Sequence, residues 1–174
     1  MQKKAYPQSK SAYGGSLLNT RAGRARPRPL ATGQSMHFVL RSSKAVGQWS
    51  FKRSQNEKKI REILAKFSAK HAVKIFRLAV VGNHLHLHLK ISHVMNYQPF
   101  IRAVSGAIAM AVTGASRWKP LKAKERFWDY RPFSRVIIGK REWENICRYI
   151  EINQLEGMGY SRDAARFTIA WNSS

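Results

Sequence analysis

The chain has 174 residues, 44% of them hydrophobic, which is enough for one full domain with its own core. It carries 32 Lys and Arg against 9 Asp and Glu, and this net charge of +23 indicates a polyanionic partner, either nucleic acid or an anionic membrane surface. No apolar run approaches the roughly 18–20 residues of a membrane-spanning helix, and no signal peptide is recognisable. The single cysteine, Cys147, excludes an intrachain disulfide and fits a reducing cytosol. We therefore expect a cytoplasmic protein that binds nucleic acid.

Residues 1–35 are predicted to form a flexible basic arm, and residues 36–174 a single domain. The arm holds no acidic residue, and its prolines and glycines argue against a helix or a central strand. We expect the arm to follow DNA phosphates or to enter a groove. Its candidate DNA contacts are Arg21, Arg24, Arg26 and Arg28. The alternative is a solubilising tail that makes no specific contact.

The pattern of the domain predicts strands and helices in alternation. A β-rich stretch covers 36–41, and apolar residues at i, i+3, i+4 and i+7 predict a helix over 56–71. We then predict a strand over 73–81, a turn at Gly82-Asn83, a strand ending at Ile91, a helix over 99–114, a strand over 133–138, a helix over 141–156 and a short last helix from Ser161. This order matches an α+β, ferredoxin-like split β-α-β fold, with two helices on one face of a four-stranded antiparallel sheet. The helix over 141–156 is added to that fold and can cross the other face.

Residues 116–131 are predicted to form a basic, aromatic connection. Arginine and lysine interleaved with aromatic rings can hold phosphates while the rings stack on unpaired bases. The candidate DNA contacts are Arg117, Lys119, Lys122, Lys124, Arg126 and Trp128. The alternative is that these aromatic side chains only cover the edge of the sheet.

The stretch Asn83-His84-Leu85-His86-Leu87-His88-Leu89 carries the strongest functional signal. At strand period, one face carries three imidazoles and the other carries leucines that would pack under the helices. The histidines are expected on an open face within reach of a substrate, where two of them can bind one metal ion together. The alternative is a strand whose polar face only meets solvent.

The helix over 141–156 can bring the groups that such a metal pair lacks. Tyr149 lies roughly 110° from the core stripe of this helix, at about 100° per residue, and Asn153 follows one turn later on the same flank. Gln154 points closer to the core, so Asn153 is the better partner by geometry and Gln154 is the alternative. Two imidazoles and an amide oxygen can bind a divalent cation that polarises a phosphodiester. A tyrosine can then attack phosphorus and form a covalent intermediate.

Together these residues resemble the single-tyrosine HUH (His-hydrophobic-His) transposases, and most closely the branch associated with repetitive extragenic palindromes (REP). The family's Asn-His-Val-His-Leu is matched by Asn83-His84-Leu85-His86-Leu87, and its Tyr-Ile-x-x-Asn helix by Tyr149-Ile150-Glu151-Ile152-Asn153. Its early strand and its aromatic stretch look like His37-Phe38-Val39-Leu40-Arg41-Ser42 and Phe127-Trp128-Asp129-Tyr130-Arg131-Pro132-Phe133. The resemblance covers about residues 36–156.

The resemblance implies a transposase-like DNA endonuclease and strand-transferase of the prokaryotic nucleoid. Such proteins bind hairpin DNA, cleave adjacent single-stranded DNA and keep the 5′ end on the tyrosine. By resemblance, Tyr149 is the nucleophile, His84 and His86 are ligands of Mg²⁺ or Mn²⁺, and Asn153 is the third ligand. Family members include homodimers whose tyrosine acts in trans and monomers that act in cis, and both arrangements stay open.

Alternatives remain at the level of both the site and the function. In the insertion-sequence branch a glutamine takes the amide position, which keeps Gln154 open. The additional His88 also leaves open a metal pair made of His86 and His88. A second hypothesis for function is a non-catalytic nucleic-acid-binding module on the same fold, and a third is a basic structural protein of a ribonucleoprotein.

Overall fold

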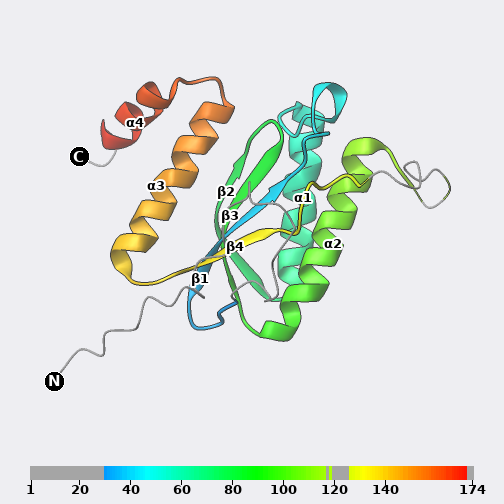
Figure 1. The fold of residues 1–174 in the computed structure, drawn as a ribbon, viewed down its shortest axis with the longest axis horizontal. Coiled ribbons are helices and arrows are strands. Elements are labelled where there is room, and N and C mark those ends of the chain that lie inside the picture. The colour runs from blue at the N-terminus through cyan, green and yellow to red at the C-terminus, as the bar shows by residue number, and fades with distance from the viewer. Residues whose placement is uncertain (1–29, 117, 119–125, 172–174) are drawn as a thin grey trace.

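The computed structural model describes residues 30–116, 118 and 126–171 (Figure 1). Its elements in chain order are β1 (Ser35–Arg41), a 3₁₀ turn (Gly47–Trp49), α1 (Ser54–Lys70), β2 (Val73–Val80), β3 (His84–Ile91), α2 (Val94–Thr113), β4 (Phe133–Ile137), α3 (Lys140–Gly157) and α4 (Arg162–Trp171). Several predicted DNA contacts lie outside the described residues, namely Arg21, Arg24, Arg26, Arg28, Arg117, Lys119, Lys122 and Lys124.

The four strands form one sheet in the order β2-β3-β1-β4. Every neighbouring pair is antiparallel, with β1 between β3 and β4, and β2 at the edge beside β3. The chain thus runs through two interleaved β-α-β units, which is the ferredoxin-like arrangement predicted from the order of the elements. The α+β fold class is confirmed.

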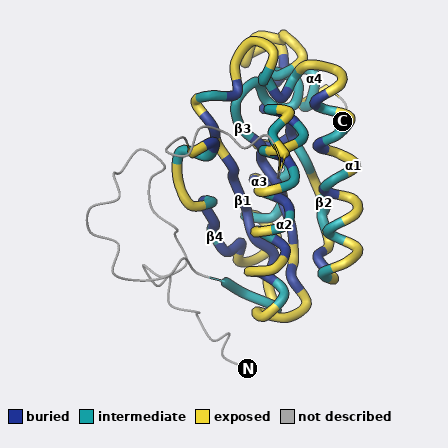
Figure 2. The backbone as a smooth tube through the Cα atoms, turned by 90° about the vertical axis from the view of Figure 1, so that its right-hand side faces the viewer, coloured by how far each residue is buried: buried dark blue, intermediate teal, exposed yellow. Residues whose placement is uncertain are grey.

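The leucine face of β3 packs under α1 and α2, as its alternating pattern predicts. Leu85, Leu87 and Leu89 are buried in the main core with residues of both helices, among them Ile60 and Ile108. Full burial of each such side chain contributes about 1.5–3 kcal/mol. Figure 1 shows α1 and α2 together on one side of the sheet, and Figure 2 shows buried residues concentrated along β1 and β3.

Helix α2 begins at Val94 rather than at the predicted residue 99. Pro99 indicated a helix start because proline has no N–H to donate inside a helix. The prediction was wrong because Tyr97, which lies in the first turn before Pro99, is buried in the core. Its burial, at about 1.5–3 kcal/mol for a large apolar side chain, outweighs one missing helical hydrogen bond of about 1 kcal/mol.

Helix α3 lies on the opposite face of the sheet from α1 and α2 (Figure 1). Its Ile146 and Ile150 pack against Ala79 of β2 and Ile137 of β4, and these four residues form a second, smaller buried cluster. The sheet therefore has helical cover on both faces, and the added helix is the one that carries Tyr149.

The expectation that the histidine face of β3 is open to a substrate is wrong for most of the strand. His86 is 4% exposed and His88 is 0% exposed, because α3 packs over them. Only His84, at the start of the strand, is half-buried. The helix that delivers the tyrosine also closes the face on which the histidines lie.

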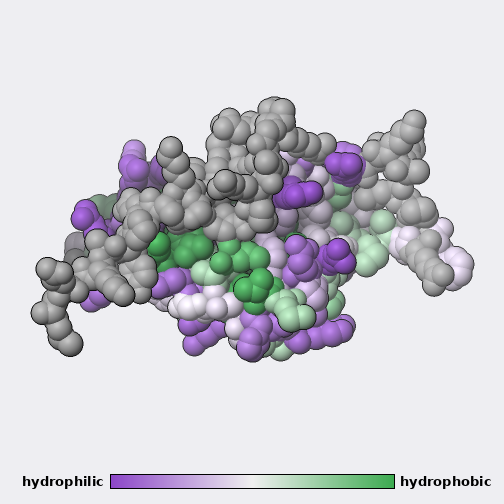
Figure 3. Space-filling view, turned by 60° about the horizontal axis from the view of Figure 1, so that its bottom comes forward, coloured by the Kyte–Doolittle hydropathy of each residue, from purple (hydrophilic) through white to green (hydrophobic). Residues whose placement is uncertain are grey.

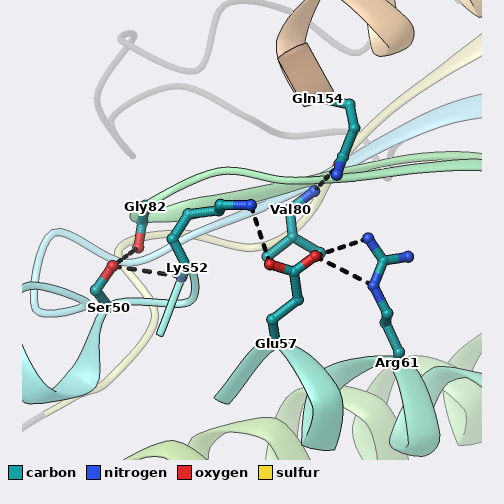
Figure 4. Close-up of polar contacts among 7 residues, drawn as sticks. All are labelled: Ser50, Lys52, Glu57, Arg61, Val80, Gly82 and Gln154. Atoms are coloured by element: carbon teal, nitrogen blue, oxygen red, sulfur yellow. Dashed lines mark hydrogen bonds and ion pairs between the residues drawn. The ribbon is translucent and has the colours of Figure 1, made fainter. Parts of the chain in front are cut away.

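The C-terminal half of α3 is anchored to the end of β2. Gln154 Oε1 accepts a hydrogen bond from the backbone N–H of Val80 over 3.0 Å (Figure 4). Gly157 ends the helix so close to the same strand that a Cβ at this position would lie 2.9 Å from the Val80 carbonyl oxygen. These two contacts fix how far along the sheet α3 can lie.

Apolar side chains reach the surface at several places among the described residues. On the face shown in Figure 3, apolar side chains gather in the middle and hydrophilic side chains lie around them. On α4, Phe167 and Trp171 are exposed, with their rings stacked at 6.3 Å between centroids. Within the described part of the chain, every helix is too short or too polar to cross a membrane.

Candidate active site

Four histidines from two adjacent strands lie on the sheet face that α3 covers, and two of them, His37 and His86, contact Tyr149 of α3. His84, His86 and His88 come from β3, and His37 comes from β1, where it lies opposite His88 and diagonal to His86. The Tyr149 ring centroid lies 5.4 Å from that of His86 and 5.7 Å from that of His37. The His84 and His86 ring centroids are 4.7 Å apart. One chain therefore brings the predicted nucleophile beside the predicted metal pair.

In both His84 and His86, the ring nitrogen that lies within hydrogen-bond distance of a neighbour is Nδ1. His84 Nδ1 lies 2.8 Å from Asn83 Oδ1, and because an amide oxygen only accepts, Nδ1 carries the proton. His86 Nδ1 lies 3.1 Å from Nε2 of His37. His86 Nε2 is the one buried side-chain nitrogen or oxygen of the described residues that has no hydrogen-bond partner. Such an atom is rare in folded proteins and fits a position that a cation fills.

The two neighbouring amides of α3 differ in which atom is free. Asn153 Nδ2 donates to the carbonyl oxygen of Tyr149 over 2.7 Å, so Asn153 Oδ1 is the atom left for a ligand. Gln154 Oε1 already accepts from the Val80 N–H. Asn153 is also 8% exposed, on the helix that covers the histidines. The geometry therefore favours Asn153 over Gln154 as an oxygen ligand.

Both ring nitrogens of His88 have a partner within the fold. Its Nε2 lies 2.8 Å from Ser35 Oγ, and its Nδ1 lies 3.5 Å from Cys147 Sγ. The Trp143 ring packs against it at 4.1 Å between centroids. Because both nitrogens of His88 have partners and the residue is fully buried, the geometry favours His84 with His86 as the predicted metal pair over His86 with His88.

Burial keeps all four imidazoles neutral at neutral pH. It lowers the pKa of His37 and of His88 to about 4 and that of His86 to about 2, and neighbouring cations or imidazoles add to each shift. Burial, followed by the charge of Arg41, also lowers the pKa of His84. A neutral imidazole has the lone pair that metal binding requires.

Access to this cluster is from the side of His84 and Tyr149. Tyr149 is 37% exposed, whereas His86 is buried behind it. Arg41, the β1 partner of His84 in the sheet register, lies at the same end and is partly exposed. A cation here can attract a phosphate toward the tyrosine.

The family comparison agrees with this geometry. No curated protein sequence matches the chain. The model of the family described as "Transposase IS200 like" matches residues 31–153, a span that runs from just before β1 to Asn153. The chain belongs to the IS200-like transposase family.

Two solved structures resemble this IS200-like transposase. One is a REP-associated tyrosine transposase bound to a REP hairpin, with 16% sequence identity, a TM-score of 0.59, and coverage of 75% of this chain and 72% of the other. At this identity the likeness concerns the fold. The other is a putative transposase from Deinococcus radiodurans R1, with 18% identity, a TM-score of 0.44, and coverage of 77% and 98%.

Two of the predicted DNA contacts in the connection over 116–131 lie among the described residues, Arg126 and Trp128. Arg126 is exposed, as a phosphate contact requires. Trp128 is half-buried, packs against Phe51 and Phe127 at 5.8 and 5.0 Å between ring centroids, and donates its indole N–H to the Ser105 carbonyl oxygen over 3.0 Å. Packing accounts for Trp128, in line with the alternative that these aromatics cover the sheet edge, and base stacking stays a prediction.

His37 is the residue of this IS200-like transposase site that sequence reasoning missed. It stands in the predicted first strand, but its place beside His86 depends on the register of β1 against β3. The available signal was that the predicted strand over 36–41 also carries a histidine, His37. That signal indicates a contact only once the two strands are known to be neighbours.

Proposed function

We propose that this IS200-like transposase is a divalent-metal-dependent endonuclease and strand-transferase for single-stranded or hairpin DNA, with Tyr149 as its nucleophile. One observation carries the proposal: within one chain, a partly exposed tyrosine lies 5.4 Å from His86, whose buried Nε2 has no partner. A hydrolase that used water as its nucleophile would need no tyrosine at this position.

Three groups of the chain fit Mg²⁺ or Mn²⁺: Nε2 of His84, Nε2 of His86 and Oδ1 of Asn153. Their support is the orphaned nitrogen of His86, the fixed tautomer of His84 and the free amide oxygen of Asn153. Nitrogen and oxygen ligands in one set suit such ions, with Mn²⁺ the more tolerant of imidazole. When bound, the cation would polarise the scissile phosphate and offset the negative charge that develops on it.

The covalent step belongs to Tyr149. Its Oη forms a bond to phosphorus while the bond from phosphorus to the 3′ oxygen of the preceding nucleotide breaks. The phenol loses its proton and the departing 3′ oxygen gains one, which leaves a 5′-phosphotyrosine and a free 3′-OH. A 3′-OH can attack that phosphotyrosine in reverse and transfer the strand. The rings of His37 and His86, which pack against Tyr149 at steep angles, support the orientation of its side chain, and a nucleophile held in one orientation reacts faster.

The proposed substrate is DNA with a hairpin beside a single-stranded segment. The net charge of +23 supports a polyanionic partner, and the solved relative at a TM-score of 0.59 is bound to a REP hairpin. We assign phosphate contacts to Arg126, to the basic residues of 116–131 and to the arm over 1–35, with residues 36–174 as one catalytic domain. Because Tyr149 and its partners belong to one chain, cleavage in cis needs no second copy.

The test is a covalent adduct between protein and DNA. We expect labelled hairpin-containing single-stranded DNA, incubated with Mg²⁺ or Mn²⁺, to give a slow-migrating adduct on a denaturing gel. The adduct should disappear in Tyr149→Phe and persist in the matched variant Tyr160→Phe, because Tyr160 is exposed beyond the end of α3. An adduct that survives in Tyr149→Phe would refute the nucleophile. Uncleaved DNA bound tightly and with steep salt dependence would identify a non-catalytic binder instead.

A further inference from the structure

His37 is 8% exposed, and its ring contacts both the predicted metal ligand His86 and the predicted nucleophile Tyr149. Its Nε2 is 3.1 Å from Nδ1 of His86, and the two rings are nearly parallel, 12° apart. The Tyr149 ring packs against the edge of His37 at 75°. His37 therefore touches the site directly, although the family motifs over 83–87 and 149–153 do not include it.

The bond between the two imidazoles needs one donor and one acceptor, so it couples their tautomers. If His37 donates, His86 Nδ1 accepts and the proton of His86 is on Nε2. That arrangement buries an N–H that has no acceptor and removes the lone pair from the side of the site. If His86 donates from Nδ1, its Nε2 has a free lone pair.

In the second arrangement, His84 and His86 have the same tautomer, with the proton on Nδ1 and the lone pair on Nε2. His84 donates from Nδ1 to Asn83 Oδ1 and so presents an Nε2 lone pair. Metal-binding histidines almost always donate their other N–H to a fixed acceptor, which sets both tautomer and ring orientation. Asn83 provides this acceptor for His84, and His37 is the group in position to provide it for His86.

We propose that His37 is a positioning residue that accepts the Nδ1–H of His86 and thereby directs the Nε2 lone pair of His86 toward the metal position. The inference rests on the proposed function for the identity of the ligand, a divalent cation. It predicts a property of the metal-free chain that can be measured without any DNA cleavage.

The first experiment reads the tautomer in the metal-free, full-length protein. Long-range ¹H–¹⁵N correlation spectra of ¹⁵N-labelled protein distinguish imidazoles protonated on Nδ1 from those protonated on Nε2, and His86→Ala assigns the His86 signals. We expect His86 to be protonated on Nδ1 in the wild type. Protonation on Nε2 would overturn the proposal, whatever the activity of the protein.

The second experiment compares two substitutions of His37 whose side-chain amides differ in length by one methylene. In His37→Gln the amide oxygen can occupy the place of the imidazole Nε2, whereas in His37→Asn it is one methylene too short. We expect His37→Gln to keep the Nδ1 tautomer of His86 and near wild-type affinity for Mn²⁺, measured by calorimetry. His37→Asn should lose the single tautomer and bind Mn²⁺ about 10–100-fold more weakly, the usual effect of removing such a partner.

Two controls separate positioning from general damage. Ser35→Ala removes the hydroxyl beside His88 and should leave both the His86 tautomer and Mn²⁺ affinity unchanged. Circular dichroism shows whether each variant is folded. If folded His37→Asn keeps the His86 tautomer and binds Mn²⁺ as the wild type does, the proposal fails. If the tautomer responds as expected but the wild type forms no adduct with DNA, the positioning role stands and the proposed function fails.

Discussion

At the residue scale, the adjacent side-chain amides of Asn153 and Gln154 in α3 differ in which atom is hydrogen-bonded. Asn153 commits its nitrogen to the Tyr149 carbonyl and keeps its oxygen free, while Gln154 commits its oxygen to Val80. We expect Asn153→Ala to lower Mn²⁺ affinity by about tenfold or more, because one oxygen ligand is lost. Calorimetric titration of the metal-free protein with Mn²⁺ measures the effect.

Gln154→Ala is the matched control, because it truncates the next side chain on the same helix. It should leave Mn²⁺ affinity near the wild-type value. It should lower the free energy of unfolding by about 1–3 kcal/mol, because the part-buried N–H of Val80 loses its acceptor. If Gln154→Ala weakened Mn²⁺ binding and Asn153→Ala did not, the third ligand would be Gln154.

At the element scale, the position of α3 against β2 depends on Gly157, the last residue of the helix. A Cβ at Gly157 would lie 2.9 Å from the Val80 carbonyl oxygen, a backbone atom that cannot move without disturbing β2. We expect Gly157→Ala to lower the free energy of unfolding by about 1–3 kcal/mol, the usual effect of overpacking. Urea denaturation measures it, and the yield of covalent adduct should fall with the displacement of Tyr149.

Gly106 provides the opposite case within α2. It lies in an exposed helical position, and an added Cβ would meet nothing within 4 Å. Gly106→Ala should therefore stabilise the protein by about 0.5–1 kcal/mol through helix propensity. If Gly157→Ala left the free energy of unfolding unchanged or raised it, as is expected of Gly106→Ala, the contact between α3 and β2 would not depend on the glycine.

The fold was predictable from the sequence because its signals are local. The alternation over 84–89, the apolar spacing of 56–71 and the turn at Gly82-Asn83 each specify an element within a few residues, and their order selects the topology. The early start of α2 was not predictable, because the burial of Tyr97 overrides the local signal of Pro99.

The site was predictable only in part. Tyr149 and Asn153 share a helix flank, and His84 and His86 share a strand face, so spacing alone groups each pair. The contact between His37 and His86 and the burial of His86 depend on strand register and on where α3 lies, both set by tertiary packing. Such properties of a site arise between elements and leave no trace at a fixed spacing in the chain.

At the scale of the whole molecule, a strongly basic protein encloses a neutral, buried histidine cluster between its sheet and α3. The net charge of +23 attracts polyanions over a long range. The cluster instead depends on exclusion of water, because hydration would favour protonated imidazoles that cannot bind a metal. Stability and metal binding are therefore coupled through the same buried side chains.

This coupling predicts loss of stability in mild acid. In the folded chain the pKa values of His37 and His88 are about 4 and that of His86 is about 2, against an ordinary value of 6.5 that applies in the unfolded chain. Between pH 6.5 and pH 4 the unfolded chain thus binds more protons, so the free energy of unfolding falls as the pH falls. Each histidine adds a slope of at most about 1.4 kcal/mol per pH unit.

Urea denaturation from about pH 7 to about pH 5 tests this linkage, because most carboxylates stay ionised in that range. We expect the free energy of unfolding to drop by several kcal/mol across it. His37→Gln should reduce the slope by the share of one proton, on the order of 1 kcal/mol per pH unit, since glutamine keeps the hydrogen bond to His86 but does not titrate. A stability that stays flat down to about pH 5 would mean that the folded chain takes up as many protons as the unfolded chain, so that burial does not lower the pKa values of these histidines.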